Sequence, residues 1–371
     1  MKRLVLAGGG HAHLRVLAEI GKRPLQGWQV DLVSPHEHQI YSGMLPGWIA
    51  GHHPLSACLV PLRPLAERAG IAFHLTAATA LDMPRNALQC DNGRSLNFDA
   101  LSLDVGPAPA LDGLVLDSAD VLPIRPLAGL VDAWPRLMER IGSQCKPFHL
   151  VIVGAGAGGL ELALSVHHRA MREGWSHLKV TLVGADDSPL AGAPERARAL
   201  ALALLVQRGI GWQGQRRVER IQANEIAFTR QPPLRFDACW LATGAAAPTW
   251  LRSSGLDLDA RGFVRVTQCL QSRSHSHVFA AGDVASPEVS PPPPKSGVYA
   301  VRAGLPLAHN LRAICTGQPL VQWKPQQRAL YLVSTGDRNA IGIWGAWSWQ
   351  GRWAWRWKSR IDHAFVSRYA G

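Results

Sequence analysis

The chain has 371 residues, 47% of them hydrophobic, and a formal net charge of +12. This length allows two or three domains with full cores, and no apolar run approaches the ~20 residues that a membrane-spanning helix needs. The positive charge is compatible with nucleic acid, an anionic membrane surface or anionic cofactors as partners. Because no nucleic-acid-binding motif accompanies the charge, we expect no nucleic-acid partner.

The first residues predict a dinucleotide-binding unit. Residues 4–7 form a short apolar run typical of a buried parallel strand, and residues 14–20 have helical spacing. Between them stands GGGHAH, in which Gly8 permits a tight turn and Gly10 lets the backbone approach a pyrophosphate. The third glycine of the usual pattern is His13. A glycine-rich turn without a ligand is the alternative.

A second copy strengthens this prediction. Residues 150–153 are again an apolar run, and residues 160–164 again have the composition of a helix. The sequence GAGAGG between them places Gly154, Gly156 and Gly159 in the three glycine positions of the dinucleotide motif. Two such motifs in one chain predict two dinucleotide sites.

An acidic residue often ends the second strand of such a unit and binds the adenosine ribose. Ser34 stands at this position after the predicted strand 28–33, and a hydroxyl can still bind a ribose. In the second unit Gly184 stands there, after the strand 179–183. Nearby arginines could accept the 2′-phosphate of NADPH, so the sequence leaves NADH and NADPH open.

The remaining segments complete an alternation of strands and helices. Residues 36–51, rich in aromatic residues, glycine and proline, predict an ordered loop that either faces a ligand or packs on the surface. The other predicted elements are helices at 61–69, 123–141, 158–173, 194–208 and 295–313, strands at 71–76, 99–106, 237–244 and 277–283, and a hairpin at 88–98.

The order of motifs resembles one superfamily. The two glycine turns, LDVG at 103–106, ATG at 242–244 and AAGD at 280–283 are similar to the FAD- and NAD(P)H-dependent pyridine nucleotide oxidoreductases with two dinucleotide-binding domains. Within this group the chain resembles type II NADH:quinone oxidoreductases and relatives of sulfide:quinone reductase. The phrases GGGHAHL, YSGMLPG and PKSGVYAVRAG resemble the branch that includes a flavoprotein unit fused to selenophosphate synthetase. The likeness covers residues 1–317.

The resemblance implies an α/β fold with two Rossmann-like domains, in which the NAD(P)H domain is inserted into a discontinuous FAD domain. The expected boundaries are 1–120 and 247–317 for the FAD domain, 121–246 for the NAD(P)H domain and 318–371 for a tryptophan- and arginine-rich C-terminal region with a β-hairpin and a helix.

The resemblance also implies which residues bind the two cofactors, FAD and NAD(P)H, and it implies no metal site. The expected FAD-binding residues are Gly8, Gly10, His11, Ala12, His13, Ser34, Ala78, Gly106, Gly282 and Asp283, with Asp283 at the ribityl chain. The expected NAD(P)H-binding residues are Gly154, Gly156, Gly159 and Gly244.

The implied reaction is hydride transfer from NAD(P)H to FAD, followed by electron transfer to a quinone-type acceptor. The cofactor supplies the redox chemistry and the protein orients it. Glu161 and Lys295 are the candidate catalytic residues near the flavin; the alternative for each is a structural role at the surface. His11 and His13 either tune the flavin or pack within the turn.

The spacing of the cysteines restricts the kinds of redox chemistry that we expect. Six are scattered along the chain without a CxxC pair or metal-ligand spacing, at positions 58, 90, 145, 239, 269 and 315. We therefore expect reduced thiols, no dithiol chemistry and no sulfide-oxidising set. Where type II dehydrogenases carry a glutamine-containing quinone motif, this chain has residues 295–299, KSGVY. The quinone acceptor is therefore implied by the relatives alone. Two alternatives are a redox module or sensor that serves a selenium- or sulfur-linked partner protein, and a protein whose second site is vestigial.

The C-terminal tail is rich in tryptophan. Trp347, Trp349, Trp353, Trp355 and Trp357 share odd positions, a period of two that predicts strands, with a hairpin turn at 350–352 and a helix at 358–369. The indole face either packs as core or meets an anionic membrane surface through Arg352, Arg356, Lys358 and Arg360. Because the chain begins directly with a core strand, we expect a cytoplasmic protein, peripheral on the inner face of the cell membrane in the second case.

Overall fold

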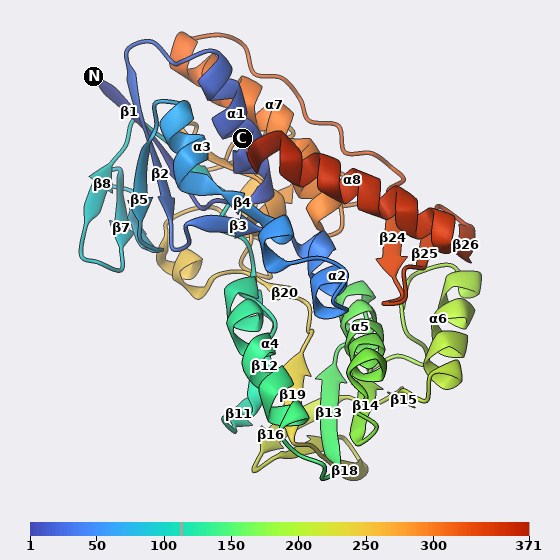
Figure 1. Ribbon diagram of the computed structural model, residues 1–371. Coiled ribbons are helices and arrows are strands. Elements are labelled where there is room, and N and C mark those ends of the chain that lie inside the picture. Colours follow the sequence, from blue (N-terminus) through green and yellow to red (C-terminus); the bar gives the residue numbers. More distant parts are fainter. Residues whose placement is uncertain (112–113, 371) are drawn as a thin grey trace.

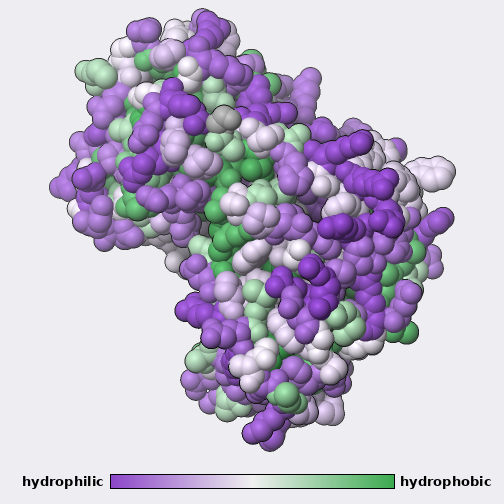
Figure 2. Space-filling view, in the orientation of Figure 1, coloured by the Kyte–Doolittle hydropathy of each residue, from purple (hydrophilic) through white to green (hydrophobic). Residues whose placement is uncertain are grey.

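The computed structural model describes residues 1–111 and 114–370. Two α/β units lie one above the other in Figure 1, and the C-terminal helix runs along the side of the upper unit. Figure 2 shows a largely hydrophilic face, with hydrophobic residues gathered mainly in the waist between the two units.

The upper unit is built on a five-stranded parallel sheet in the order β22-β9-β1-β2-β5. Its strands are β1 (Lys2–Ala7), β2 (Trp28–Ser34), β5 (Ala72–Leu75), β9 (Ala100–Leu103) and β22 (Val278–Ala280). The helices α1 (His11–Lys22) and α7 (Gly297–Thr316) pack against each other. The central strand β1 is apolar and buried from Leu4 to Ala7, because helices cover a parallel sheet on its faces.

The lower unit repeats this plan. Its parallel sheet has the order β12-β19-β13-β14-β15, formed by β12 (Val121–Pro123), β13 (Phe148–Val153), β14 (Leu178–Val183), β15 (Gly211–Gln213) and β19 (Ala238–Leu241). The helices are α4 (Leu127–Gly142), α5 (Ala157–Glu173) and α6 (Glu195–Gln207). The predicted α/β class with two Rossmann-like units is confirmed.

The chain crosses between the units twice, side by side. The short strands β10 (Ala108–Pro109) and β20 (Ala245–Ala246) pair antiparallel. β11 (Val115–Asp117) already pairs with β16 (Val218–Gln222) in the lower unit. The first crossing therefore comes before residue 115, earlier than the expected boundary at residue 120.

The segment expected as a loop at 36–51 contains regular structure. β3 (His38–Ile40) pairs with β4 (Leu59–Pro61), and between them lie η1 (Ser42–Met44), α2 (Leu45–Ile49) and η2 (Leu55–Cys58). The smaller elements are α3 (Leu62–Arg68), β6 (Ala78–Asp82), β7 (Ala87–Cys90), β8 (Ser95–Asn97), β17 (Glu225–Phe228), β18 (Gln231–Arg235), η3 (Thr249–Ser253), β21 (Val264–Val266), η4 (Gly282–Val284) and β23 (Ala285–Pro287).

The tail corrects the prediction from its tryptophan spacing. A three-stranded antiparallel sheet is formed by β24 (Leu330–Ser334), β25 (Ala340–Trp344) and β26 (Trp347–Gly351). α8 (Arg352–Ala370) follows without a hairpin turn. The turn predicted at 350–352 is wrong, because β26 ends there and α8 begins; the helix starts six residues before position 358.

The period of two spans this strand–helix boundary and has no single structural meaning. Trp349, Trp353 and Trp357 instead stack four residues apart, with ring centroids 5.6 and 6.5 Å from one ring to the next. Among the described residues, no helix has both the length and the apolar character to cross a membrane.

Candidate functional site

The first glycine turn joins β1 to α1 at the edge of the upper sheet. Gly8 has φ +97°, and a Cβ at this residue would collide with the backbone of Asp104 at the end of β9. A Cβ at Gly10 would collide with the carboxyl group of Asp104. Gly10 is therefore required by Asp104, which is a different reason from the close approach of a pyrophosphate that the sequence suggests.

Asp104 caps the N-terminus of α1. Its Oδ2 accepts hydrogen bonds from the N–H groups of Ala12 at 2.8 Å and His13 at 2.9 Å. The residue is 3% exposed. Burial raises the pKa of the Asp104 carboxyl to about 7, although the two amide bonds oppose this shift. The turn therefore contains a titratable carboxyl group next to the helix end that would face an anionic cofactor.

His13 takes the packing role. Its Nδ1 lies 2.6 Å from the carbonyl oxygen of Gly8 and its Nε2 lies 2.8 Å from Oγ of Ser102 on β9. Burial lowers the pKa of His13 to about 4, so the ring is neutral at pH 7. The imidazole of His13, at the position where the usual motif has a glycine, therefore links the turn to the sheet by hydrogen bonds.

His11, at the first position of α1, packs near aromatic side chains from other elements. Its ring lies 5.7 Å from the rings of Tyr41 and of Phe365 on α8. Burial lowers the pKa of His11 to about 4, and among the described residues its Nε2 has no hydrogen-bond partner. A buried polar atom without a partner beside the helix terminus fits a site that holds a polar cofactor.

Asp283 lies in η4, after Gly282, which has φ +68°. Its Oδ2 is 3.2 Å from Nη1 of Arg125, on the segment that leads from β12 into α4. A Cβ at Gly282 would collide with Oδ1 of Asp104. The structure thus brings Gly8, Gly10 and Gly282 against Asp104, with Asp283 close by.

Three further expected FAD contacts lie in different settings. The Oγ of Ser34 donates to the carbonyl of His36 at 2.9 Å and accepts from the His36 N–H, so this hydroxyl is engaged in a local turn. Ala78 begins β6 and pairs with Cys90. Gly106 has φ +73° and stands just before the first crossing.

The second turn is open. Gly154 has φ +110°, and a Cβ there would collide with the backbone of Ala242. A Cβ at Gly159 would collide with the carbonyl of Gly154, whereas a Cβ at Gly156 or Gly244 would meet no atom within 4 Å. The free space over Gly156 fits a nucleotide pyrophosphate at the N-terminus of α5.

Gly184 directly follows β14 and faces the ring of Trp212. A Cβ at this residue would approach the Trp212 ring at 2.7 Å and the Cβ of Ala155 at 2.8 Å. No acidic side chain fits here without displacing Trp212. In the lower unit, Thr243 also has a buried Oγ1 without a hydrogen-bond partner in the described part of the chain.

Glu161 lies one turn into α5, where the lower unit meets the C-terminal sheet. Its Oε1 accepts a hydrogen bond of 2.7 Å from the N–H of Ser334 at the end of β24. Burial raises the pKa of Glu161 to about 7; Lys358 and the Ser334 amide lower it and Asp362 raises it. Glu161 is therefore part of a charged network and not a solvated helix-surface carboxylate.

The other members of this network come from α8 and from the segment before α2. Lys358 donates to the carbonyl of Gly43 at 2.6 Å and to Oδ2 of Asp362 at 2.7 Å, and the hydroxyl of Tyr41 donates to Oδ1 of Asp362 at 3.0 Å. Lys358 is only 8% exposed. Its expected contact with lipid is therefore wrong: the side chain points into the protein because Asp362 and Gly43 satisfy its ammonium group.

Burial by itself lowers the pKa of Lys358, but Asp362 and Glu161 outweigh this and raise it above its ordinary value. A small pocket lies over this network, lined by His53, Ser334, Trp355, Lys358, Asp362 and His363 among others. We call Glu161, Lys358, Asp362 and Tyr41 the junction cluster.

Lys295 stands just before α7 and is partly buried. Its ammonium group donates to the carbonyl of Ala285 and lies 4.0 Å from the centre of the Phe263 ring. Burial lowers the pKa of Lys295 to about 8, while Asp283 and Asp259 raise it. Lys295 is close enough to Asp283 for this carboxylate to affect its pKa, but it is not part of the junction cluster.

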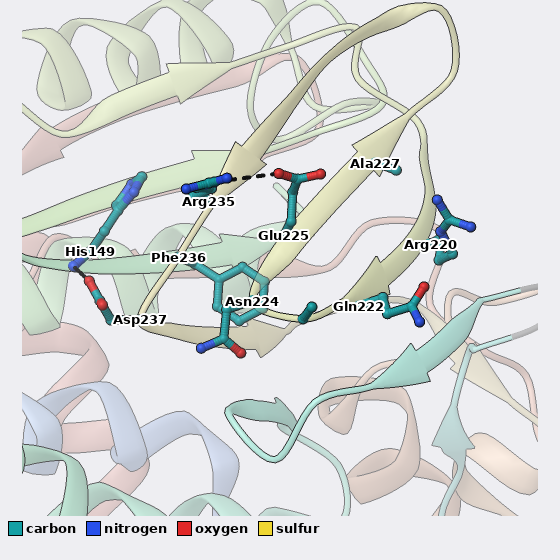
Figure 3. A pocket seen from close by; sticks show the side chains of 10 residues that line it. His149, Arg220, Gln222, Asn224, Glu225, Ala227, Arg235, Phe236 and Asp237 are labelled. Atoms are coloured by element: carbon teal, nitrogen blue, oxygen red, sulfur yellow. Dashed lines mark hydrogen bonds and ion pairs between the residues drawn. The ribbon is translucent and has the colours of Figure 1, made fainter.

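A hollow much larger than the pocket over the junction cluster lies elsewhere. It measures about 720 Å³ and opens over β16–β18, where His149, Glu225, Arg235 and Asp237 line it (Figure 3). His149 and Asp237 stand at the amino ends of β13 and β19, whereas both glycine turns follow carboxyl ends. Ligands of open α/β sheets bind at the carboxyl ends, so we assign the dinucleotide site to the turns and not to this hollow.

The paired sheets, each with a glycine turn at its carboxyl edge, define a flavoprotein with two dinucleotide-binding domains. The family model for pyridine nucleotide-disulphide oxidoreductases matches residues 2–310, and the chain belongs to this family. FAD is the cofactor and a nicotinamide nucleotide the co-substrate in this family, so the protein is an FAD-dependent NAD(P)H oxidoreductase.

Individual relatives agree with this assignment. Sulfide-quinone reductase of Aquifex aeolicus is 21% identical over 361 residues, which covers 91% of this chain and 82% of the relative. Type II NADH:quinone oxidoreductase of Haemophilus influenzae is 27% identical over 208 residues, 52% of this chain and 46% of the relative. The structure of NDH2 from Plasmodium falciparum in complex with NADH shares the fold, with a TM-score of 0.83 at 12% identity, covering 100% of this chain and 99% of the other.

Sequence reasoning missed Asp104, Arg125, Tyr41 and Asp362. Asp104 interrupts an apolar strand end, and a buried acid in such a place is an unusual signal. Lys358 and Asp362 are four residues apart on the side of α8 that also carries the buried Phe365 and Tyr369. A charged pair of this spacing within an apolar stripe was a detectable sign of a buried ion pair.

Proposed function

We propose that this protein is an NAD(P)H dehydrogenase whose electron acceptor is a quinone. FAD, when bound, supplies hydride and electron transfer, and the net reaction is NAD(P)H + H⁺ + quinone → NAD(P)⁺ + quinol. This reaction consumes a proton besides the hydride. The observation that carries the proposal is the junction cluster, because it holds proton-bearing groups beside a pocket lined by the segment 43–53, by Ser334 of the C-terminal sheet and by α8, and Ser334 donates directly to Glu161 of the lower unit.

The chain's own groups have separate tasks. Glu161, with a pKa raised by burial to about 7, holds a proton near neutral pH and can release it. Lys358 keeps its charge, and the one N–H that it does not donate to Gly43 or Asp362 can orient an acceptor oxygen. Tyr41 holds Asp362 in place through its hydroxyl. We assign Glu161 to proton delivery, Lys358 to acceptor binding and Tyr41 to positioning.

Cysteine chemistry does not support a sulfide acceptor or donor. Cys58 is close enough to Lys358 and Asp362 for both charges to affect its pKa. Burial raises the pKa of Cys58 to about 12, so its thiol stays protonated and is a poor nucleophile. The quinone assignment therefore fits this cluster better than sulfide oxidation does.

A membrane surface fits the exposed side of α8. One face of the helix is buried and contains Phe365 and Tyr369, so part of the tail is core. The opposite face of the helix exposes aromatic and basic side chains, and Trp347 on the preceding strand β26 is exposed as well. Together these residues form the interfacial face: Trp347, Trp353, Trp357, Ile361, Arg352, Arg356 and Arg360. Tryptophan prefers the headgroup zone and arginine attracts anionic lipid, where a quinone is also found.

The first experiment is anaerobic reduction of the purified yellow protein by NADH and by NADPH, followed by steady-state turnover with a water-soluble quinone. We expect reduction and turnover, with NADH as the better donor on the basis of the resemblance. Glu161→Gln should lower the turnover rate without releasing FAD. In the parent the rate should fall as the pH rises through about 7, since Glu161 then loses its proton, and this step should be absent in Glu161→Gln.

Rapid reduction by NADH with no turnover on any quinone would contradict the proposal and favour a redox module for a partner protein. Membrane binding is tested separately, by sedimentation with anionic vesicles at low salt. Trp347→Ser, Trp353→Ser and Trp357→Ser combined should weaken sedimentation but keep turnover with the soluble quinone. Val206→Ser, which removes a 72% exposed side chain on α6, is the control and should change neither.

A further inference from the structure

The turn that faces FAD contains a carboxyl group that the redox reaction does not use. Asp104 lies between α1 and η4, with Gly10 on one side and Gly282 on the other. Both glycines are explained by its carboxyl group, since a Cβ at either position would overlap it. The two oxygens differ, because Oδ2 accepts both α1 amides while Oδ1 lies toward Gly282.

The surroundings of Asp104 are short of positive charge. The charged or titratable groups around it are His13 on α1, Asp283 in η4, and the three groups that act on Asp283 or are acted on by it, which are His11, Arg125 and Lys295. Both imidazoles have a pKa lowered by burial to about 4 and are neutral at pH 7. Arg125 is already paired with Asp283 at 3.2 Å. The partial positive charge of the α1 N-terminus is therefore the main stabilisation of an ionised Asp104.

An incoming FAD adds two phosphate charges at this same helix end. Its pyrophosphate and an ionised Asp104 would then repel each other at one helix end in a buried site. A proton on Oδ1 removes this repulsion without loss of the amide bonds, because Ala12 and His13 donate to Oδ2. It also turns Oδ1 into a donor on the side of Asp283 and Gly282.

We propose that Asp104 is a proton-linked positioning residue for FAD: it takes up a proton when the cofactor binds, and the protonated carboxyl group holds the α1 turn against the pyrophosphate. The carboxyl gains one proton from solvent and the cofactor is unchanged. FAD affinity then depends on pH. Below the pKa of Asp104 in the cofactor-free protein the affinity is constant, and above it each pH unit weakens binding about tenfold.

The experiment follows release of FAD from the holoprotein by the rise in flavin fluorescence on dilution, from pH 6 to pH 9. In the parent the dissociation constant should be level near pH 6 and should rise about tenfold per unit at the alkaline end. Asp104→Asn, whose amide oxygen can still accept the helix N–H groups, should give a level profile. Asp257→Asn, a surface substitution outside the turn, should keep the slope of the parent.

Calorimetry gives a direct measurement on the unmodified chain. When FAD is titrated at pH 8.5 into protein freed of cofactor, in buffers of different ionisation enthalpy, the uptake should approach one proton per FAD; Asp104→Asn should take up none. ADP-ribose has a pyrophosphate but no nicotinamide. Titrated into the FAD-loaded protein, where the first turn is filled, it is expected at the second turn, which has Ala242 in place of the acid, and its binding should take up no proton.

A level FAD profile in the parent, or no proton uptake at pH 8.5, would overturn the proposal, and so would an Asp104→Asn variant that keeps the slope of the parent. If this variant fails to fold, calorimetry on the parent decides. These outcomes do not depend on turnover, and a failure of the quinone assignment would leave them unchanged.

Discussion

The two dinucleotide units have the same strand plan but different residues behind their glycine turns. A Cβ at Gly8 would strike the backbone of Asp104, and a Cβ at Gly154 would strike the backbone of Ala242, so these two residues occupy equivalent places. His13 and Gly159 are likewise equivalent by position in the motif. In the upper unit the side chains of His13 and Asp104 form hydrogen bonds to the turn. In the lower unit Gly159 packs directly on the backbone of Gly154.

This difference fits the proposed placement of FAD at the upper turn and of NAD(P)H at the lower turn. A resident cofactor gains from a turn that is held rigid by the bonds of His13 and Asp104, since a preorganised site loses less entropy on binding. A co-substrate must leave after each turnover, and the open space over Gly156 provides for exchange. The comparison teaches that one backbone motif can be made rigid or open by the residues behind it.

The largest expected effect comes from filling the open turn. A Cβ at Gly156 would meet no protein atom within 4 Å, so Gly156→Val should retain the fold and FAD. The branched side chain would occupy the space of the nucleotide phosphates, and reduction by NAD(P)H should fall about 100-fold or more. Stopped-flow reduction is the measurement, with dithionite reduction as the control. Equal loss of FAD would show that the two sites are assigned to the wrong units.

The equivalent alanine substitutions should separate the two turns. Gly10→Ala forces a methyl group onto the Asp104 carboxyl and should cost about 1–3 kcal/mol of unfolding free energy together with FAD retention. Gly156→Ala should change neither, as measured by denaturant unfolding and bound-flavin absorbance. Asp104→Ala removes the obstacle but also the cap of α1, so adding Gly10→Ala to Asp104→Ala should cost little further stability. A double variant that loses the full cost of Gly10→Ala beyond that of Asp104→Ala would refute the packing argument.

The hydrogen bond between His13 and Ser102 should have a smaller effect on function than the substitutions in the glycine turns. Ser102→Ala leaves a buried nitrogen of His13 without its partner and should lower the free energy of unfolding by about 1–3 kcal/mol. The lower unit has a similar pair, His149 Nε2 to Thr181 Oγ1 at 2.8 Å, but His149 is more exposed. Thr181→Ser, which keeps the hydroxyl, should cost little, and a larger loss there than in Ser102→Ala would contradict the comparison.

The smallest effect on turnover is expected for the thiols. Replacing all six cysteines by serine or alanine should lower stability, because Cys58, Cys90 and Cys239 are buried. Any folded, flavin-loaded variant should keep its NAD(P)H oxidation rate. A single cysteine whose loss abolishes turnover while flavin remains bound would instead indicate sulfide or disulfide chemistry.

Local pattern was a reliable guide where one element decides its own structure. The runs at β1 and β13 are apolar because both faces of a parallel strand are covered, and the glycines that follow permit φ values that other residues avoid. It failed at residues 347–357, where a strand passes directly into a helix. A single period cannot describe two elements, so the tryptophan pattern predicted a hairpin turn where α8 begins.

The sequence by itself determined the two dinucleotide units and, through their order, the family, because each motif lies within one strand, turn and helix. Only the tertiary structure decided what stands behind each turn and beside the flavin site. Asp104 meets Ala12 across 92 residues and Asp362 meets Tyr41 across 321, so no local pattern relates them. Lys358 reads as a surface cation along the chain and becomes a buried donor because the packing of α8 brings Gly43 and Asp362 to it.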